Sequence, residues 1–228
     1  MVKDQEYVFL PKRLVVLVSG RGSNLQAILS ACASGQIPAT EVVAVISNRP
    51  QAAALALAAA AGIPVRCVDH RRFGDRSSFD AALRAQIDDF APDHIALAGF
   101  MRRLTPEFAQ HYGGRMVNIH PSLLPAFPGL HTHAQALAEG VKLHGATVHF
   151  VTADLDAGPI IVQGAVPVLA QDDVDSLAAR VLAMEHRIYP QAIAWLVSGR
   201  LRMEQGKVTI DGEKAGEFSP CIWPGTED

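Results

Sequence analysis

Short, continuously apolar runs alternate with segments of helical apolar spacing over the first half of the chain. The runs predict strands at residues 14–19, 42–47, 65–68, 94–98 and 115–119. The segments between them predict helices from residue 25 onwards and at residues 51–61, 77–90 and 106–111. Strands that alternate with helices in this way predict an α/β fold with a largely parallel sheet.

The pattern changes in the second half of the chain. Predicted strands at residues 146–151 and 160–168 are separated only by the loop at residues 154–159, too short for a helical crossover, so we expect them to be antiparallel. Residues 174–197 predict one long helix, and residues 201–203 and 208–210 a terminal hairpin. The predicted fold class is α/β and Rossmann-like, a mostly parallel sheet flanked by helices, with antiparallel strands in the C-terminal half.

The length of the chain, 228 residues, is enough to bury one substantial core. No linker of disordered composition interrupts the pattern. We expect a single domain at residues 13–212, between loosely held tails at residues 1–12 and 213–228.

Charge and composition argue against several classes of partner. The formal net charge of -3 disfavours a general nucleic-acid binder, which needs a basic surface. No segment approaches the roughly 18 uncharged apolar residues of a membrane helix, and no secretion signal is recognisable. Cys32, Cys67 and Cys221 form no CxxC pair and are typical of reduced thiols. We therefore expect a cytoplasmic protein without nucleic-acid or membrane partners.

A glycine-rich turn follows the first predicted strand, with the sequence Ser-Gly-Arg-Gly-Ser-Asn at residues 19–24. Glycine allows close backbone approach, and the N–H groups of a helix start, with the side chains of Ser23 and Asn24, suit a phosphate. The spacing matches neither GxGxxG nor GxxxxGK[ST], which weakens a dinucleotide or ATP site. A monophosphate site is favoured, and the alternative is a tight turn in which Ser23 or Asn24 caps the helix.

Asn118, His120 and Asp156 form the second candidate site. Asn118 and His120 lie two residues apart on one predicted strand, so their side chains share a face near its carboxyl end. An amide can stabilise an oxyanion, a histidine can exchange a proton near neutral pH, and a carboxylate can orient that histidine or accept a proton. The alternative is that all three residues only support their own strand end and loops.

Other chemistries have weaker support in the sequence. His131 and His133, with His120, His144 and His149, superficially resemble a metal-ligand cluster, but neither HExxH nor a zinc-type Cys/His spacing occurs. The interpretation that we favour has no metal. The absence of GxSxG disfavours a serine hydrolase.

Five motifs together resemble the phosphoribosylglycinamide formyltransferases, the folate-dependent family of purine synthesis. They are the turn at residues 19–24, Leu-Ala-Gly-Phe-Met-Arg at 97–102, Asn-Ile-His-Pro-Ser-Leu-Leu-Pro at 118–125, Pro-Gly-Leu-His-Thr-His at 128–133 and Asp-Leu-Asp-Ala-Gly-Pro at 154–159. The resemblance extends from about residue 14 to beyond residue 201, in the order of the family. Several motifs that agree are more specific than any one of them.

The resemblance implies transfer of a formyl group from the co-substrate 10-formyltetrahydrofolate to the amine of 5'-phosphoribosylglycinamide, without metal or ATP. It assigns the phosphorylated substrate to Gly22, Ser23, Asn24 and Glu185. It assigns the folate to Arg76, Met101, Arg102, Arg103, Leu104, Asn118, Thr152, Ala153, Asp154, Leu155 and Asp156. The N-terminal half would then bind phosphate, and the C-terminal half would bind folate and carry the chemistry, in a monomer or a homodimer.

The same resemblance gives the catalytic residues their roles. Asn118 would donate a hydrogen bond to the formyl oxygen as the amine attacks, and protonated His120 would donate another or supply charge. Asp156 would orient His120, favour its charged form and receive the amine proton. Two positions depart from the family: Arg103 stands where an aliphatic residue is frequent, and Thr147 where serine is frequent.

Three other functions compete with formyl transfer to the amine. A formyltetrahydrofolate hydrolase is similar around residues 140–147 and would use the same three residues on water, but usually carries an N-terminal regulatory domain, for which residues before 14 leave no room. A methionyl-tRNA formyltransferase would need a large RNA-binding extension. A non-catalytic ligand-binding subunit would lack a working set of Asn118, His120 and Asp156.

Overall fold

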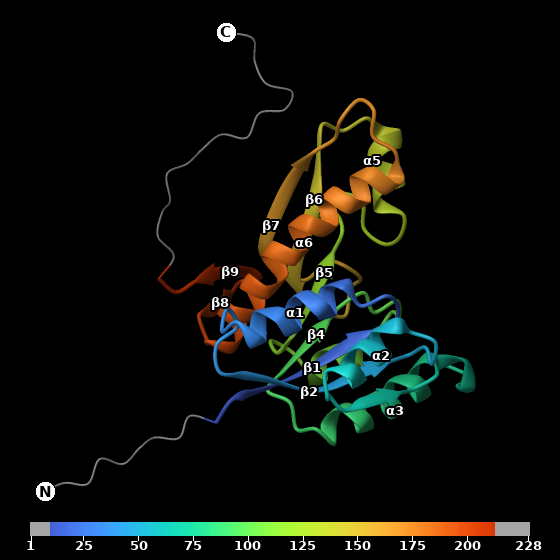
Figure 1. Ribbon diagram of the computed structural model, residues 1–228, viewed down its shortest axis with the longest axis vertical. Helices are drawn as coiled ribbons and strands as arrows, with labels where there is room; N and C mark the ends of the chain where they lie inside the picture. The colour runs from blue at the N-terminus through green and yellow to red at the C-terminus, as the bar shows by residue number, and fades with distance from the viewer. Residues whose placement is uncertain (1–9, 213–228) are drawn as a thin grey trace, which may run out of the picture.

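A seven-stranded sheet forms the centre of the computed structural model, which describes residues 10–212 (Figure 1). The strand order is β3-β2-β1-β4-β5-β6-β7. The strands are β1 (Lys12–Val18), β2 (Thr40–Ser47), β3 (Val65–Cys67), β4 (His94–Leu97), β5 (Met116–His120), β6 (Leu143–Phe150) and β7 (Ile160–Pro167). A separate hairpin consists of β8 (Leu201–Glu204) and β9 (Lys207–Ile210).

The direction of the strands confirms the predicted fold class. All neighbouring strands from β3 to β5 pair in parallel, whereas β5 with β6 and β6 with β7 are antiparallel. The turn between β6 and β7 leaves no room for a crossover helix, so the chain returns directly along the sheet. The change of direction at β5 places the strands that follow it beside the end of the parallel part.

Helices cover both faces of the sheet. They are α1 (Ser23–Ala33), α2 (Ala53–Ala60), α3 (Arg76–Asp88), α4 (Pro106–His111), α5 (Thr132–Glu139) and α6 (Val174–Val197), with a 3-10 turn, η1, at His70–Arg72. One buried cluster packs α1, α2, α5 and α6 against one face, and a second packs α3 and α4 against the other. Both faces of the central strands are thus removed from water, which explains why β1 is apolar at consecutive positions.

The long helix α6 packs along one face of the sheet with its 24 residues (Figure 1). A capping box closes its start, in which Asp173 accepts from the Ser176 N–H and the Ser176 hydroxyl accepts from the Asp173 N–H. The buried Tyr189 hydroxyl donates to the carbonyl of Leu97 at the end of β4, over 2.8 Å. These contacts at two points set the position of Glu185, which lies between them on the helix.

Two details differ from the expectations from sequence. Helix α5 was not predicted, since its eight residues include only one large apolar side chain, Leu137, and it lacks a start signal such as Pro106 of α4; it starts after His131 in the left-handed conformation (φ 60) and ends before Gly140. Lys12, expected in the N-terminal tail, is the first residue of β1, and its N–H donates to the carbonyl of Ala39 over 2.7 Å. Residues 1–9 of the expected N-terminal tail and the whole expected C-terminal tail at residues 213–228, with Cys221, lie outside the described residues.

No helix within residues 10–212 has the length and apolar character needed to cross a bilayer. Cys32 is partly buried and Cys67 is exposed, and both thiols are free.

Candidate functional site

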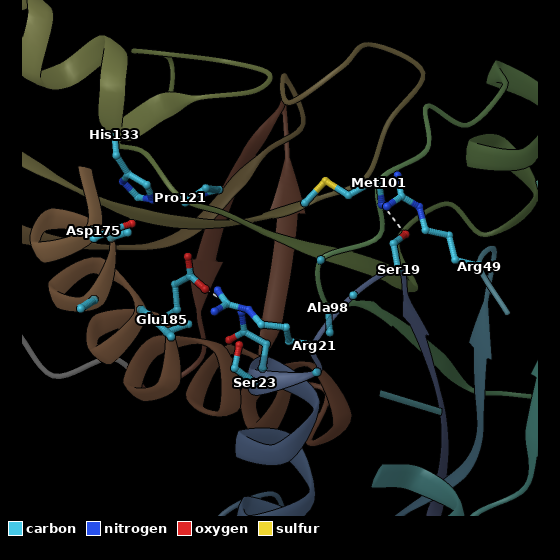
Figure 2. A pocket seen from close by; sticks show the side chains of 17 residues that line it. Ser19, Arg21, Ser23, Arg49, Ala98, Met101, Pro121, His133, Asp175 and Glu185 are labelled. Carbon is cyan, nitrogen blue, oxygen red and sulfur yellow. Dashed lines mark hydrogen bonds between the residues drawn. The ribbon is translucent and has the colours of Figure 1, made fainter. Parts of the chain in front are cut away.

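The strand order places a crevice at the carboxyl end of β1. The chain passes from β1 to β2 on one side, and β4 pairs with β1 on the other, so the connections leave in opposite directions. A cavity of about 670 Å³ occupies this position. Figure 2 shows Arg21 and Ser23 of the turn facing the side of α6 that carries Asp175 and Glu185.

The turn between β1 and α1 presents a helix start without a side-chain cap. Gly22 precedes the first helical residue with φ 91 and ψ 22, and no side chain accepts a hydrogen bond there. The alternative in which Ser23 or Asn24 caps the helix is therefore wrong, since both residues lie within α1. The first N–H groups of α1 remain without such a partner beside the cavity, an arrangement that suits an anion.

Gly22 also allows α2 to approach the turn closely. A Cβ atom at Gly22 would lie 2.8 Å from the Cβ of Ala54. The Ala54 N–H donates to the carbonyl of Gly20 over 3.1 Å, which fixes the turn against α2. The glycine is thus required both by its left-handed backbone and by the space around it.

Asn24 and Glu185 are in contact on the wall of the cavity although they lie 161 positions apart in the chain. The Asn24 amide Nδ2 donates to Glu185 Oε2 over 2.6 Å. Burial raises the pKa of Glu185, and the hydrogen bond from Asn24 opposes this shift. Both residues were assigned to the phosphorylated substrate, and the structure places both, with Gly22 and Ser23, on the wall of the same cavity.

A second, smaller cavity of about 80 Å³ lies between the chain that follows β4 and the loop that follows β6. Most residues assigned to the folate line it: Arg102, Arg103, Leu104, Asn118, Thr152, Ala153, Asp154, Leu155 and Asp156. Met101 instead lines the larger cavity, where its N–H donates to Ser19 Oγ over 2.7 Å. Arg76 lines neither of the two and lies at the first turn of α3.

Segment 98–104 therefore borders both cavities. Ala98, Gly99 and Met101 line the larger one, whereas Phe100 and Arg102 line the smaller one. Two ligands bound in these cavities would meet along this segment.

Asn118 and Asp156 line the smaller cavity, and His120 lies against Asp156. The first two share one face of β5, and Asp156 enters from the loop between β6 and β7 with a positive φ of 51. The Asp156 Oδ2 atom lies 3.5 Å from His120 Nδ1 and accepts a hydrogen bond from the Gly129 N–H over 2.9 Å. Asp156 thus joins a separate loop to His120, which argues against a role confined to its own turn.

Both ring nitrogens of His120 face oxygen atoms. Nε2 lies 3.0 Å from the carbonyl of Phe127, and Nδ1 faces the Asp156 carboxylate. The side chain of His120 is 6% exposed and that of Asp156 is 9% exposed. The pair is therefore shielded from water, where electrostatic interactions are stronger than at the surface.

His149 is a member of this group that the sequence analysis considered only as a candidate metal ligand. In the antiparallel register of β5 and β6 it lies directly opposite Asn118. Its Nε2 atom is 3.2 Å from Asn118 Nδ2 and 3.9 Å from Asp156 Oδ1. Burial lowers the pKa of His149, while the Phe150 carbonyl and Asp156 act in the opposite direction. The register between the two strands is the signal that identifies it.

The histidines considered as metal ligands do not gather into one site. His133 Nδ1 lies 3.2 Å from His144 Nε2, and His133 lines the larger cavity (Figure 2). Among residues 10–212 there is no group of three or more His, Cys, Asp or Glu side chains that could hold a metal ion.

Comparison with known proteins agrees with this arrangement. The family model described as formyl transferase matches residues 12–193. Phosphoribosylglycinamide formyltransferase of Escherichia coli is 51% identical over 201 residues, covering 88% of this chain and 94% of the relative. The structure of the phosphoribosylglycinamide formyltransferase of Coxiella burnetii superposes with a TM-score of 0.84 at 48% identity, covering 89% of this chain and 95% of that one.

A formyltetrahydrofolate deformylase of Pseudomonas syringae shares the fold more distantly. It has a TM-score of 0.81 at 28% identity, and the match covers 88% of this chain but 66% of that one. The family match covers most of the sequence and includes the turn before α1 and the Asn118, His120 and Asp156 positions. This chain belongs to the formyl transferase family.

Proposed function

We propose that this protein transfers the formyl group of 10-formyltetrahydrofolate to the amine of 5'-phosphoribosylglycinamide, giving the formylated amide and tetrahydrofolate in purine synthesis. The observation that carries the proposal is the meeting of Asn118, His120 and Asp156 beside segment 98–104, which borders both cavities. The names of the Escherichia coli and Coxiella burnetii relatives support the same activity.

The larger cavity is proposed to hold the phosphorylated substrate. Gly22, Ser23 and Asn24 would hold the phosphate at the start of α1, where free N–H groups and the helix dipole favour an anion. Glu185 would contact the ribose or the glycinamide part, since its carboxylate lines the same cavity and is held by Asn24. The volume of about 670 Å³ is in the range typical of small-molecule sites.

The smaller cavity is proposed to form one end of the folate site, since its volume of about 80 Å³ is below the range of about 300–1,000 Å³ typical of small-molecule sites. Its walls are formed by the residues from Arg102 to Leu104 and by loop 152–156, and Met101 would contact the folate from the larger cavity. Arg103 is exposed, so we assign its contact to the backbone. Arg76 lines neither cavity, and we propose for it only a contact with the acidic tail of the folate.

The proposed chemistry uses Asn118 and His120 on the formyl oxygen. The bound folate supplies the formyl group, and the neutral amine of the other substrate attacks its carbon. Asn118 donates a hydrogen bond to the oxygen as negative charge grows there. Because both nitrogens of His120 already face oxygens of the protein, the structure favours a contribution from its charge over a second hydrogen bond.

Asp156 is the proposed proton acceptor. It lies against His120 and within the smaller cavity, so it can receive the proton that the amine loses when the C–N bond forms, directly or through water. That proton then goes to the folate nitrogen as its bond to the formyl carbon breaks. Alignment of two large substrates in a confined site supplies much of the remaining acceleration.

We place this activity in the cytoplasm and propose one domain at residues 13–212, in a monomer or a homodimer. The free thiols Cys32 and Cys67 and the single central sheet support the first two proposals. The proposed activity uses no metal, no ATP, no nucleic acid and no membrane.

Turnover of 10-formyltetrahydrofolate with and without phosphoribosylglycinamide tests the proposal. We expect tetrahydrofolate and the formylated amide to appear together, and only when the amine substrate is present. Release of formate without the amine would favour the hydrolase, and the identity of 28% to the deformylase, against 51% to the Escherichia coli relative, argues against that outcome. No turnover in either case would favour a binding protein.

A further inference from the structure

The side-chain amide of Asn118 can face the substrate in two ways. Its nitrogen donates and its oxygen accepts, and the two atoms exchange places when the amide rotates by half a turn. Only the orientation that leaves an N–H available can stabilise a developing oxyanion. The structure contains a group that selects between the two orientations.

The protonation of the His149 ring follows from its backbone contact. Its Nδ1 atom lies 2.9 Å from the carbonyl oxygen of Phe150. A carbonyl oxygen can only accept, so Nδ1 must carry the hydrogen. In the neutral ring Nε2 is then a bare acceptor. His149 is 2% exposed, and burial lowers its pKa, which keeps the ring neutral.

This acceptor determines which atom of Asn118 faces it. Nε2 of His149 is 3.2 Å from Nδ2 of Asn118, a distance that an N–H···N hydrogen bond spans. The amide oxygen in the same place would set two lone pairs against each other. One N–H of Asn118 therefore goes to His149, and the second stays free on the side chain that lines the smaller cavity.

Asp156 does not compete for the same nitrogen. Its Oδ1 atom is 3.9 Å from His149 Nε2, beyond hydrogen-bond distance, whereas its Oδ2 atom accepts from the Gly129 N–H. The two histidines therefore have opposite surroundings. His120 faces acceptors at both nitrogens, and His149 faces one acceptor and one donor.

We infer that His149 is a positioning residue that fixes the Asn118 amide with its nitrogen towards β6, so that one N–H stays available to the formyl oxygen. The effect on rate rests on the proposed function, whereas the state of the ring and of the amide does not. His149 also lines the smaller cavity, but the inferred role is exerted through Asn118 and not through a contact with substrate.

A matched pair of substitutions tests the effect on rate. His149→Leu removes the acceptor at similar volume, whereas His149→Gln can present an oxygen near the position of Nε2. We expect His149→Leu to lower kcat about tenfold with the KM for phosphoribosylglycinamide changed less than about twofold, since it removes orientation and not binding. His149→Gln should retain kcat to within about threefold, because its amide oxygen replaces the hydrogen-bond acceptor that Nε2 provides.

A double-mutant cycle separates positioning from general structural damage. In the Asn118→Ala background, His149→Leu should lower kcat by less than about twofold further, because the group on which it acts is gone. An equal loss in both backgrounds, or a loss in His149→Gln as large as that in His149→Leu, would overturn the inference. Absence of formyl transfer by the unmodified protein would instead count against the proposed function.

Spectroscopy of the unmodified protein tests the inference even when variants fail to fold. Long-range proton–nitrogen correlation of the histidine rings should show His149 with its hydrogen on Nδ1 at neutral pH. A nitrogen–nitrogen coupling across the hydrogen bond should connect Nε2 to the Asn118 amide. A hydrogen on Nε2 of His149 would contradict the inference whatever the enzymatic result.

Discussion

The turn before α1 and the group around Asn118 lie at the same end of the sheet but are built differently. The turn consists of consecutive residues and offers backbone N–H groups beside an open cavity. The Asn118 group consists of buried and partly buried side chains from β5, β6 and the loop after β6. The comparison shows that a backbone anion site can be specified locally, whereas a side-chain site depends on how distant segments are paired.

The two regions also differ in exposure to water. Arg21 and Arg49 on the wall of the larger cavity are exposed, whereas His120 and His149 are buried. A charged substrate can be recognised by exposed groups, but stabilisation of a charge that exists only during reaction needs fixed dipoles without competing water. We therefore expect substitutions in the first region to act on binding and substitutions in the second to act on kcat.

Asp156→Asn should have the largest effect. The amide retains the shape and can still accept from the Gly129 N–H, but it removes the negative charge beside His120 and the proton acceptor. We expect kcat to fall about 100-fold or more, the scale seen when an electrostatic partner of the reaction is lost.

His120→Ala should give a comparable loss. Calorimetry should show that both variants still bind phosphoribosylglycinamide, since the proposed phosphate site lies at the turn before α1. Near-normal turnover in either purified variant would contradict the assignment.

Gly22→Ala should affect the other of the two regions, the turn before α1. Alanine in this left-handed conformation costs about 1–2 kcal/mol, and its Cβ would lie 2.8 Å from that of Ala54, so the turn must move. We expect the KM for the phosphorylated substrate to rise about tenfold, with kcat changed less, because the phosphate contacts move and the chemistry does not.

Gly35→Ala is the matched control for backbone strain. Gly35 also has a positive φ, of 77, but has open space around it and lies after α1, away from both cavities. Gly35→Ala should lose a similar amount of folding stability through backbone strain, while the KM for the phosphorylated substrate stays unchanged. A rise in KM for Gly35→Ala as well would show that Gly22→Ala acts through stability alone.

Thr147→Val should show how the segment after β5 is held. The buried Thr147 hydroxyl donates to the carbonyl of Ser122 over 2.7 Å and accepts from the N–H of Leu124 and the amide of Gln163, each over 3.0 Å. Valine leaves these groups without their partner, so chemical denaturation should show a loss of about 1–3 kcal/mol in the free energy of unfolding.

Thr147→Ser keeps the hydroxyl and should lose less than about 1 kcal/mol. Equal losses for the two variants would mean that the methyl group, and not the hydroxyl, stabilises this segment.

Acid should destabilise the fold through one buried and one partly buried histidine outside the reacting group. Burial lowers the pKa of His94 to about 4 and that of His144 to about 4, below their ordinary value of 6.5. Between pH 6.5 and 4 the unfolded chain therefore binds more protons at these residues, and stability falls as the pH falls. At pH 5.5 each histidine should account for a loss of about 1 kcal/mol relative to neutral pH.

His94→Gln should flatten this dependence in thermal denaturation at pH 7.5 and 5.5. Because His94 lies at the start of β4, its removal leaves both cavities intact. A variant as acid-sensitive as the unmodified protein would rule out this contribution from His94.

Some predictions from sequence depended only on neighbouring residues, and these agree with the structure. The apolar runs mark the strands of the sheet because strands buried on both faces tolerate few polar residues. Asn118 and His120 share a face because side chains alternate along a strand. Helix α5 escaped prediction because eight residues, with few large apolar side chains, carry little periodic signal.

The sequence by itself determined the alternation of strands and helices, the glycine turn before α1 and the family of the chain. Only the tertiary structure decided that His149 lies opposite Asn118, that Asp156 reaches His120 from another loop, and that Asn24 meets Glu185. The physical reason is the distance along the chain over which each interaction acts. Backbone sterics and side-chain alternation act between neighbours, whereas strand register and loop placement come from burying both faces of the sheet together.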